Sequence, residues 1–200
     1  MGHADRFDGQ FEAVLVAAQR GAPTAMETIF TTLSPVVLGY LRLQGSREPE
    51  DLTSEVFVAV LRNLDSFVGD EPGFRSWVFT IAHRRLLDER RRLARRPNVE
   101  PLFGDVDGGG VGGAGDTLAL LAPDDVEGDV EAALSVERVR SLCDQLAPDQ
   151  RDVLLLRLLG RLTIDEVATS LGKTPGAVKA LQRRGVAAVG RLLEREGVPL

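Results

Sequence analysis

The sequence predicts an all-α protein in which a flexible, acidic, Gly-rich linker joins two small helical domains. Over most of the chain, apolar residues recur at intervals of three and four, the spacing that one face of an α-helix requires. Pro and Gly stand near the ends of these segments, where helices begin and end. The composition changes abruptly in the middle of the chain, so the helical segments fall into two groups.

Charge is strongly segregated along the chain. The 200 residues carry a formal net charge of −6. Residues 75–96 are net +6, residues 97–137 are net −10 without one basic residue, and residues 138–200 are net +4. This distribution indicates two basic surfaces separated by an acidic connector.

The N-terminal group of helices is expected to pack into a core. A helix over residues 9–21 is followed by one that begins at Pro23, where Pro is acceptable in the first turn. We expect Ser34-Pro35 to interrupt this helix or to begin a further one that ends near Gly45.

The next helix is predicted from Pro49, because Glu50 and Asp51 complement the positive end of the helix dipole. Its apolar surface extends beyond a single stripe to include Val58 and Leu61. A helix that is apolar around much of its circumference is either deeply buried or binds a partner.

Residues 74–96 carry the strongest functional signal. This segment holds eight Arg against Asp88 and Glu89, and every basic residue in it is Arg, which suits bidentate phosphate contacts. Flat side chains, among them His83, could stack on unpaired bases. Helical spacing places the following on the side opposite the core: Arg84, Arg91, Arg92 and Arg95. The segment therefore predicts a nucleic-acid-binding helix.

The connector between the two groups is expected to be a flexible linker. Seven of the twelve positions from Gly104 to Gly115 are Gly, and such a composition cannot bury enough surface to order itself. The predicted organisation is an N-terminal domain over residues 1–97, a linker over 98–130 and a C-terminal domain over 131–200.

The C-terminal group contains a predicted helix-turn-helix. Thr163 is an N-cap with Glu166 at the capping-box position, and Gly172 supplies the turn. Thr174 caps the following helix, whose outer face carries basic residues that could reach guanine in the major groove. The residues of this predicted recognition face are Lys179, Gln182, Arg183 and Arg184.

Several function classes are not supported. His3, His83 and Cys143 have no partners that would form a catalytic set, and one Cys with two distant His does not suit zinc. We therefore expect no enzyme activity, no cofactor and no metal. No apolar run approaches the ~20 residues needed to cross a bilayer, and no secretory signal is visible. We expect a cytoplasmic protein without membrane insertion.

Three segments in order resemble the extracytoplasmic-function (ECF) sigma factors of bacterial RNA polymerase. Residues 48–67 resemble the region-2 helix that docks on the polymerase clamp. Residues 74–92 resemble the segment that opens and reads the −10 promoter element, and residues 146–184 resemble the region-4 domain that reads the −35 element. The resemblance implies a transcription initiation factor that binds core polymerase and directs it to promoters.

The resemblance also implies roles for particular residues. The −10 contacts would come from His83, Arg84, Arg85, Arg91, Arg92 and Arg95. The −35 contacts would come from Thr174, Lys179, Gln182, Arg183 and Arg184. Core polymerase would be bound by Asp51, Leu52, Glu55, Val58 and Leu61. Trp77 and Ile81 match positions that pack the domain core.

The partners that follow from the resemblance are core RNA polymerase, through the clamp and flap of its large subunits, promoter DNA, and an anti-sigma factor. The linker would either run through the polymerase toward the RNA exit path or act as a tether. The alternative to a sigma factor is a stand-alone helix-turn-helix regulator with an N-terminal sensing or dimerisation domain, which would bind DNA without polymerase.

Overall fold

The computed structural model describes residue 7 and residues 9–95 and 129–195, and for residues 129–136 it describes the backbone alone. Every regular element in these ranges is a helix, which confirms the predicted all-α class. The first group comprises α1 (Phe11–Gln19), α2 (Pro23–Leu43), α3 (Pro49–Arg62), the 3₁₀ turn η1 (Leu64–Ser66) and α4 (Glu71–Arg95). The second group comprises α6 (Asp129–Asp144), α7 (Pro148–Leu158), α8 (Ile164–Leu171) and α9 (Pro175–Arg195). The predicted linker, apart from its last two residues, lies outside the described residues.

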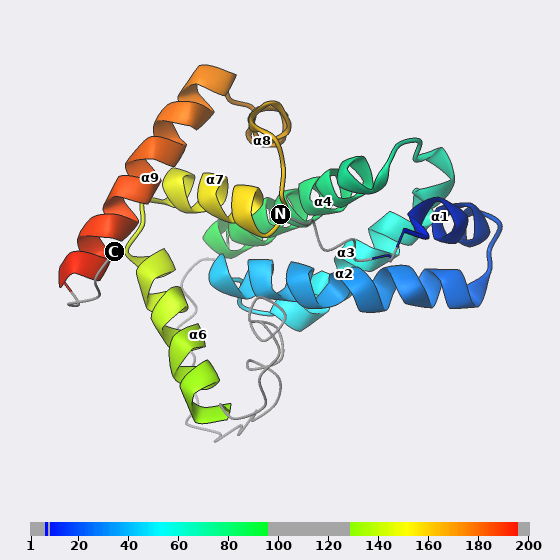
Figure 1. The fold of residues 1–200 in the computed structure, drawn as a ribbon, viewed down its shortest axis with the longest axis horizontal. Coiled ribbons are helices and arrows are strands. Elements are labelled where there is room, and N and C mark those ends of the chain that lie inside the picture. The colour runs from blue at the N-terminus through cyan, green and yellow to red at the C-terminus, as the bar shows by residue number, and fades with distance from the viewer. Residues whose placement is uncertain (1–6, 8, 96–128, 196–200) are drawn as a thin grey trace.

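The first group packs around α2. Successive pairs of α1, α2, α3 and α4 are in contact, and Figure 1 shows α2 alongside α1 and α3. The side chains of Ile29, Val37, Tyr40 and Phe74 are fully buried at the centre of this bundle. Such burial contributes roughly 1.5–3 kcal/mol for each large apolar side chain, which is the main source of stability here.

The expected break at Ser34-Pro35 is wrong. α2 is one continuous helix with Pro35 inside it. Proline removes one backbone donor and disfavours the helix interior. Buried side chains stand on both sides of it, Leu33 before and Val36 after, so core packing holds the two halves in one helix. The basic helix also begins earlier than expected, at Glu71, with Pro72 in its first turn.

The second group contains the predicted helix-turn-helix. The capping box is formed, because Oγ1 of Thr163 accepts from the Glu166 amide at 3.3 Å and Oε2 of Glu166 accepts from the Thr163 amide at 2.6 Å. Gly172 ends α8 with φ 62°, the left-handed conformation that glycine adopts without a steric cost. The Ala177 amide donates to Oγ1 of Thr174 at 3.2 Å, so Thr174 caps α9.

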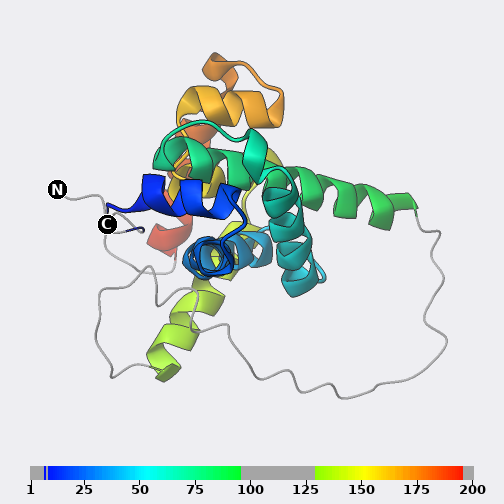
Figure 2. The same ribbon diagram turned by 90° about the vertical axis from the view of Figure 1, so that its right-hand side faces the viewer.

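The two groups are in contact. Figure 1 shows α7 and α8 lying next to α4, and Figure 2 shows the C-terminal end of α4 projecting from the rest of the molecule. Buried apolar residues of both groups belong to one continuous cluster.

Candidate nucleic-acid and polymerase interfaces

The projecting end of α4 carries a cationic outer face. Arg84, Arg91, Arg92 and Arg95 are exposed, as the helical spacing predicts. Nη1 of Arg91 lies 2.9 Å from Oδ1 of Asp88, one turn away on the same helix. An exposed ion pair of this kind is worth little, so it would yield readily to a phosphate. This face is chemically suited to bind a polyanion.

Glu55 of α3 lies beside two of these arginines. Its Oε2 is 3.8 Å from Nη1 of Arg85 and 4.0 Å from Nη2 of Arg92, and all three side chains are 43–60% exposed. Residues that were assigned to polymerase binding and to −10 contacts therefore meet at the junction of α3 and α4.

His83 is placed differently from the arginines around it. Its ring is 1% exposed, and Nδ1 lies 2.8 Å from the Tyr40 hydroxyl, with which it shares a hydrogen bond. Burial lowers the pKa of His83, while the negative charge of Asp152 opposes this shift. The same burial, followed by the charge of Asp152, raises the pKa of Tyr40. In this conformation the His83 ring is part of a buried polar cluster and is not presented to solvent.

Arg90 completes this cluster, a role that was not predicted from the sequence. Its Nη2 donates to the Gln44 carbonyl oxygen at 2.8 Å and to Oε1 of Gln44 at 2.9 Å. The signal was available in the helical spacing, because Arg90 follows the buried Leu86 by four residues and so shares its face.

The candidate polymerase-binding residues of α3 divide between surface and core. Asp51, Glu55 and Val58 are exposed, and Leu61 is half-buried. Leu52 is 4% exposed and packs in the core, so it is not available on the surface in this conformation. Trp77 is half-buried and packs against Phe67 and Phe74, with its ring centroid 5.3 and 5.6 Å from theirs.

The outer face of α9 forms the second cationic surface. Lys179, Arg183 and Arg184 are exposed and Gln182 is half-buried. A groove of about 720 Å³ is lined by Lys179, Gln182, Arg183, Val186 and Ala187. The last two are apolar and were not predicted from the sequence, although Val186 follows Gln182 by four residues and shares its face. Cationic and amide side chains beside small apolar ones can bind base edges and thymine methyl groups.

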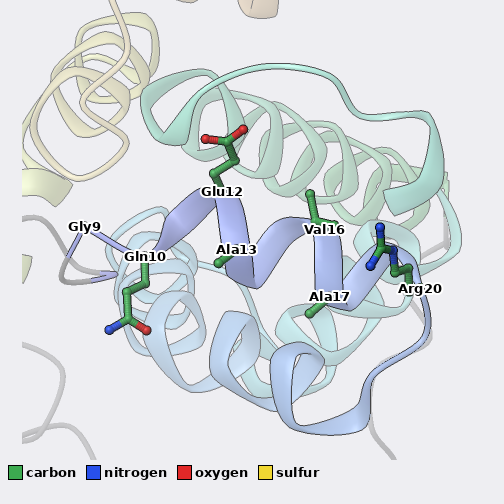
Figure 3. Close-up of a pocket in the computed structure, with 7 residues that line it drawn as sticks. All are labelled: Gly9, Gln10, Glu12, Ala13, Val16, Ala17 and Arg20. Carbon is green, nitrogen blue, oxygen red and sulfur yellow. The ribbon is translucent and has the colours of Figure 1, made fainter.

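Another hollow, of about 610 Å³, lies on the outer side of α1 (Figure 3). Gln10 and Arg20 lie towards its two ends, and the small side chains of Ala13 and Ala17 lie between them. None of the predicted site residues lines it.

The described part of the chain offers neither a metal site nor a membrane-spanning helix. It contains no group of three or more His, Cys, Asp and Glu side chains placed to hold a metal ion. None of its helices combines the length and apolar character needed to cross a membrane. Burial raises the pKa of the Cys143 thiol.

Comparisons with known proteins agree with this geometry. Residues 29–96 match the sigma-70 region 2 family and residues 137–189 match the sigma-70 region 4 family. The ECF RNA polymerase sigma factor BldN of Streptomyces coelicolor is 30% identical over 196 residues, covering 95% of this chain and 68% of BldN. The ECF RNA polymerase sigma factor ShbA of Streptomyces griseus is 30% identical over 193 residues, covering 92% of this chain and 95% of ShbA.

The fold is also similar to that of CnrH, solved in complex with the cytosolic domain of CnrY. The TM-score is 0.60 at 22% sequence identity, covering 96% of this chain and 99% of CnrH. Sigma factors are non-enzymatic regulators of transcription. With two cationic helices in the order that regions 2 and 4 require, the chain belongs to the ECF sigma factors, the initiation factors that direct bacterial RNA polymerase to promoters.

Proposed function

We propose that this sigma factor divides promoter recognition between α4 and α9 and binds core polymerase through the exposed face of α3. The observation that carries the proposal is the separation of charge: α4 and α9 each present an arginine-rich outer face, whereas α3 presents Asp51 and Glu55. The first domain spans residues 1–97 and the second spans residues 131–200.

The outer arginines of α4 hold the DNA backbone around the opening −10 region. Unstacking a base costs a few kcal/mol, which phosphate neutralisation and pocket contacts offset. Arg84 is exposed and has no acidic partner within 4 Å among the described residues, so its guanidinium can contact a flipped base or its phosphate without first breaking an ion pair. Arg85, Arg91, Arg92 and Arg95 contact the phosphates around it.

α9 positions the complex on the −35 element. Lys179, Arg183 and Arg184 contact guanine edges or phosphates, and Gln182 can pair with adenine. Thr174 at the N-terminus of α9 caps the helix, and the adjacent backbone amides can bind a phosphate.

The α3 face binds the clamp of the large polymerase subunit, and the C-terminal domain binds the flap. Asp51 and Glu55 pair with basic residues there, and Val58 and Leu61 supply apolar contact. A complex of CnrH with another protein's cytosolic domain supports a comparable partner here, an anti-sigma factor that covers α3 and α9. All of these contacts take place in the cytoplasm.

Run-off transcription tests this function directly. Core polymerase, genomic fragments from the organism that encodes the chain, and the purified protein are expected to give discrete promoter-specific transcripts. Core polymerase without the protein gives none. Absence of specific transcripts would refute the assignment, and sequence-specific DNA binding by the protein alone would favour a stand-alone regulator.

A matched pair of variants tests the polymerase contact. Asp51→Lys and Glu12→Lys each reverse an exposed acid in the first turn of a helix, so both lose a similar helix-dipole interaction. Only Asp51→Lys is expected to weaken binding to core polymerase, measured by surface plasmon resonance. Equal binding of the two variants would place the polymerase contact elsewhere.

A further inference from the structure

Arg161 has an unusual backbone conformation. It lies between α7 and α8 with φ 56°, in the left-handed region, and apart from glycines no other residue in the described part of the chain has a positive φ. In this region the Cβ of an L-residue lies too close to the following carbonyl oxygen, a cost that glycine avoids. Arginine is therefore an unfavourable residue for the fold at this position.

The turn itself requires the left-handed conformation. A Cβ added to Gly160 would lie 2.5 Å from Cδ1 of Leu162 and 2.6 Å from the Leu156 carbonyl oxygen, so position 160 has room for glycine alone. On the other side of Arg161, the Leu162 side chain is fully buried and its amide donates to the Leu156 carbonyl oxygen at 3.2 Å. Packing and hydrogen bonds thus fix the residues on both sides of Arg161 and hold it in the strained conformation.

The side chain of Arg161 makes no compensating interaction within the described part of the chain. It is exposed and forms no hydrogen bond or ion pair there. Other arginines of α7 behave differently, because Arg157 donates to the Leu162 carbonyl oxygen and Nη1 of Arg151 lies 3.0 Å from Oδ1 of Asp144. Residues held in strained conformations concentrate at sites that bind a ligand. The guanidinium of Arg161 is thus available to a partner outside the protein.

The position of Arg161 in the helix-turn-helix indicates what this partner is. Arg161 precedes α8, the first helix of the unit, by three residues, on the segment that joins α7 to α8 (Figure 1). When the second helix of such a unit lies in the major groove, the first helix crosses the DNA backbone. The chain at the start of α8 is therefore close to phosphates. The planar guanidinium of arginine binds phosphate oxygens in pairs.

We infer that Arg161 binds a phosphate of promoter DNA beside the bases that α9 reads. The inference rests on the proposed function of α9 and adds to it a residue that favours DNA binding at the expense of folding stability. A phosphate contact carries no sequence information, so it strengthens binding to all promoters of this sigma factor alike. It also releases about one counterion, which makes binding more dependent on salt.

Replacing Arg161 separates its role in binding from its effect on folding. Arg161→Gly removes both the charge and the Cβ, and Arg161→Asn removes the charge and introduces a residue that tolerates the left-handed region. Both variants are expected to unfold at a urea concentration at least as high as the parent. With core polymerase, both are expected to bind promoter DNA about fivefold more weakly at about 0.15 M salt, because one counterion fewer is released. The slope of the logarithm of affinity against the logarithm of salt concentration should fall by about 0.9.

Two further variants are the controls. Arg161→Lys retains the positive charge, so its salt slope should equal that of the parent. Arg20→Asn removes an exposed arginine at the end of α1, where φ is −84°, and should change neither the salt slope nor the promoter affinity. Filter binding of the polymerase complex to promoter DNA at several salt concentrations measures affinity and slope, and urea denaturation measures stability.

Three results would overturn the inference. A lower urea midpoint in Arg161→Asn would show that the arginine side chain serves the fold. An unchanged affinity and salt slope in Arg161→Asn and Arg161→Gly would show that Arg161 contacts no phosphate. Weaker binding of these variants to core polymerase, with the salt slope of DNA binding unchanged, would assign the side chain to a protein partner. The parent protein tests the proposed function separately: if its polymerase complex binds no promoter specifically, that function fails, and the inference fails with it.

Discussion

At the scale of single residues, the most informative position is His83. It is followed in the sequence by the exposed Arg84 and the half-buried Arg85, yet its own ring is buried against Tyr40. The groups that face it come from three helices: Tyr40 from α2, Arg90 from α4 and Asp152 from α7. His83 was predicted to contact DNA because of the arginines that follow it in the sequence. In the structure it lies where the two domains meet.

The burial of His83 predicts a loss of stability in mild acid. Burial lowers the pKa of His83 in the folded protein, so below about pH 6.5 the unfolded chain binds a proton that the folded chain does not. The free energy of unfolding should therefore fall as the pH falls below about 6.5. Urea denaturation at pH 7.5 and 5.5 measures this change in the free energy of unfolding.

His83→Asn is the control for this effect. Asn places a polar atom near the position of Nδ1, so it retains a hydrogen bond to Tyr40 but cannot titrate. The variant is expected to lose less stability than the parent between pH 7.5 and 5.5. The same loss in both proteins would assign the acid sensitivity to other groups.

At the scale of elements, the capping box of α8 is expected to contribute measurably to stability. Thr163→Ala removes the side-chain acceptor for the Glu166 amide and should lower the free energy of unfolding by about 1 kcal/mol. Thr169→Ala is the matched control, because its exposed hydroxyl only donates to a carbonyl of its own helix. Its effect should be within about 0.5 kcal/mol. Similar losses of stability in the two variants would show that the capping box is not the source of the stability that Thr163→Ala removes.

The recognition helix offers a second matched pair. Arg183 lines the groove of α9, whereas Arg191 is an exposed arginine of the same helix outside that groove. Arg183→Ala should weaken binding of the polymerase complex to its promoter by about 1–3 kcal/mol, and Arg191→Ala much less. Filter binding over a range of salt concentrations measures both. If Arg191→Ala had the larger effect, the DNA-contacting part of α9 would lie nearer its C-terminus.

Element boundaries were predicted best where local chemistry acts alone. The capping box at Thr163, the left-handed Gly172 and the cap at Thr174 are all formed as expected, because each depends on side chains within four residues. The break predicted at Ser34-Pro35 does not occur, because the effect of Pro35 on α2 depends on the core into which Leu33 and Val36 pack. Local sequence carries no information about how strongly such a core favours one continuous helix.

At the scale of the whole molecule, the contact between α4 and α8 is expected to hold the two domains together. Ser170→Arg places a long charged side chain where the Thr80 and Ser170 hydroxyls are 2.8 Å apart and should weaken this contact. The variant should therefore have a larger radius of gyration than the parent, measured by small-angle X-ray scattering.

Thr169→Arg is the control for this prediction. Thr169 is the exposed neighbour of Ser170 on α8, so both variants add the same charge to the same helix. An equal increase in the two variants would show that added charge, rather than loss of the contact with Thr80, expands the molecule.

The sequence by itself determined the helical class, the two domains' family and the outward-facing arginines of α4 and α9. These properties follow from local periodicity, helix caps and the order of segments along the chain. The tertiary structure alone decided which polar residues of the same helices turn inward, away from solvent: His83, Arg75 and Arg90 on α4, and Asp152 on α7. Periodicity shows that two faces of a helix differ. Which of them meets a core, a second domain or solvent depends on contacts between residues far apart in the chain, and a local pattern does not record those contacts.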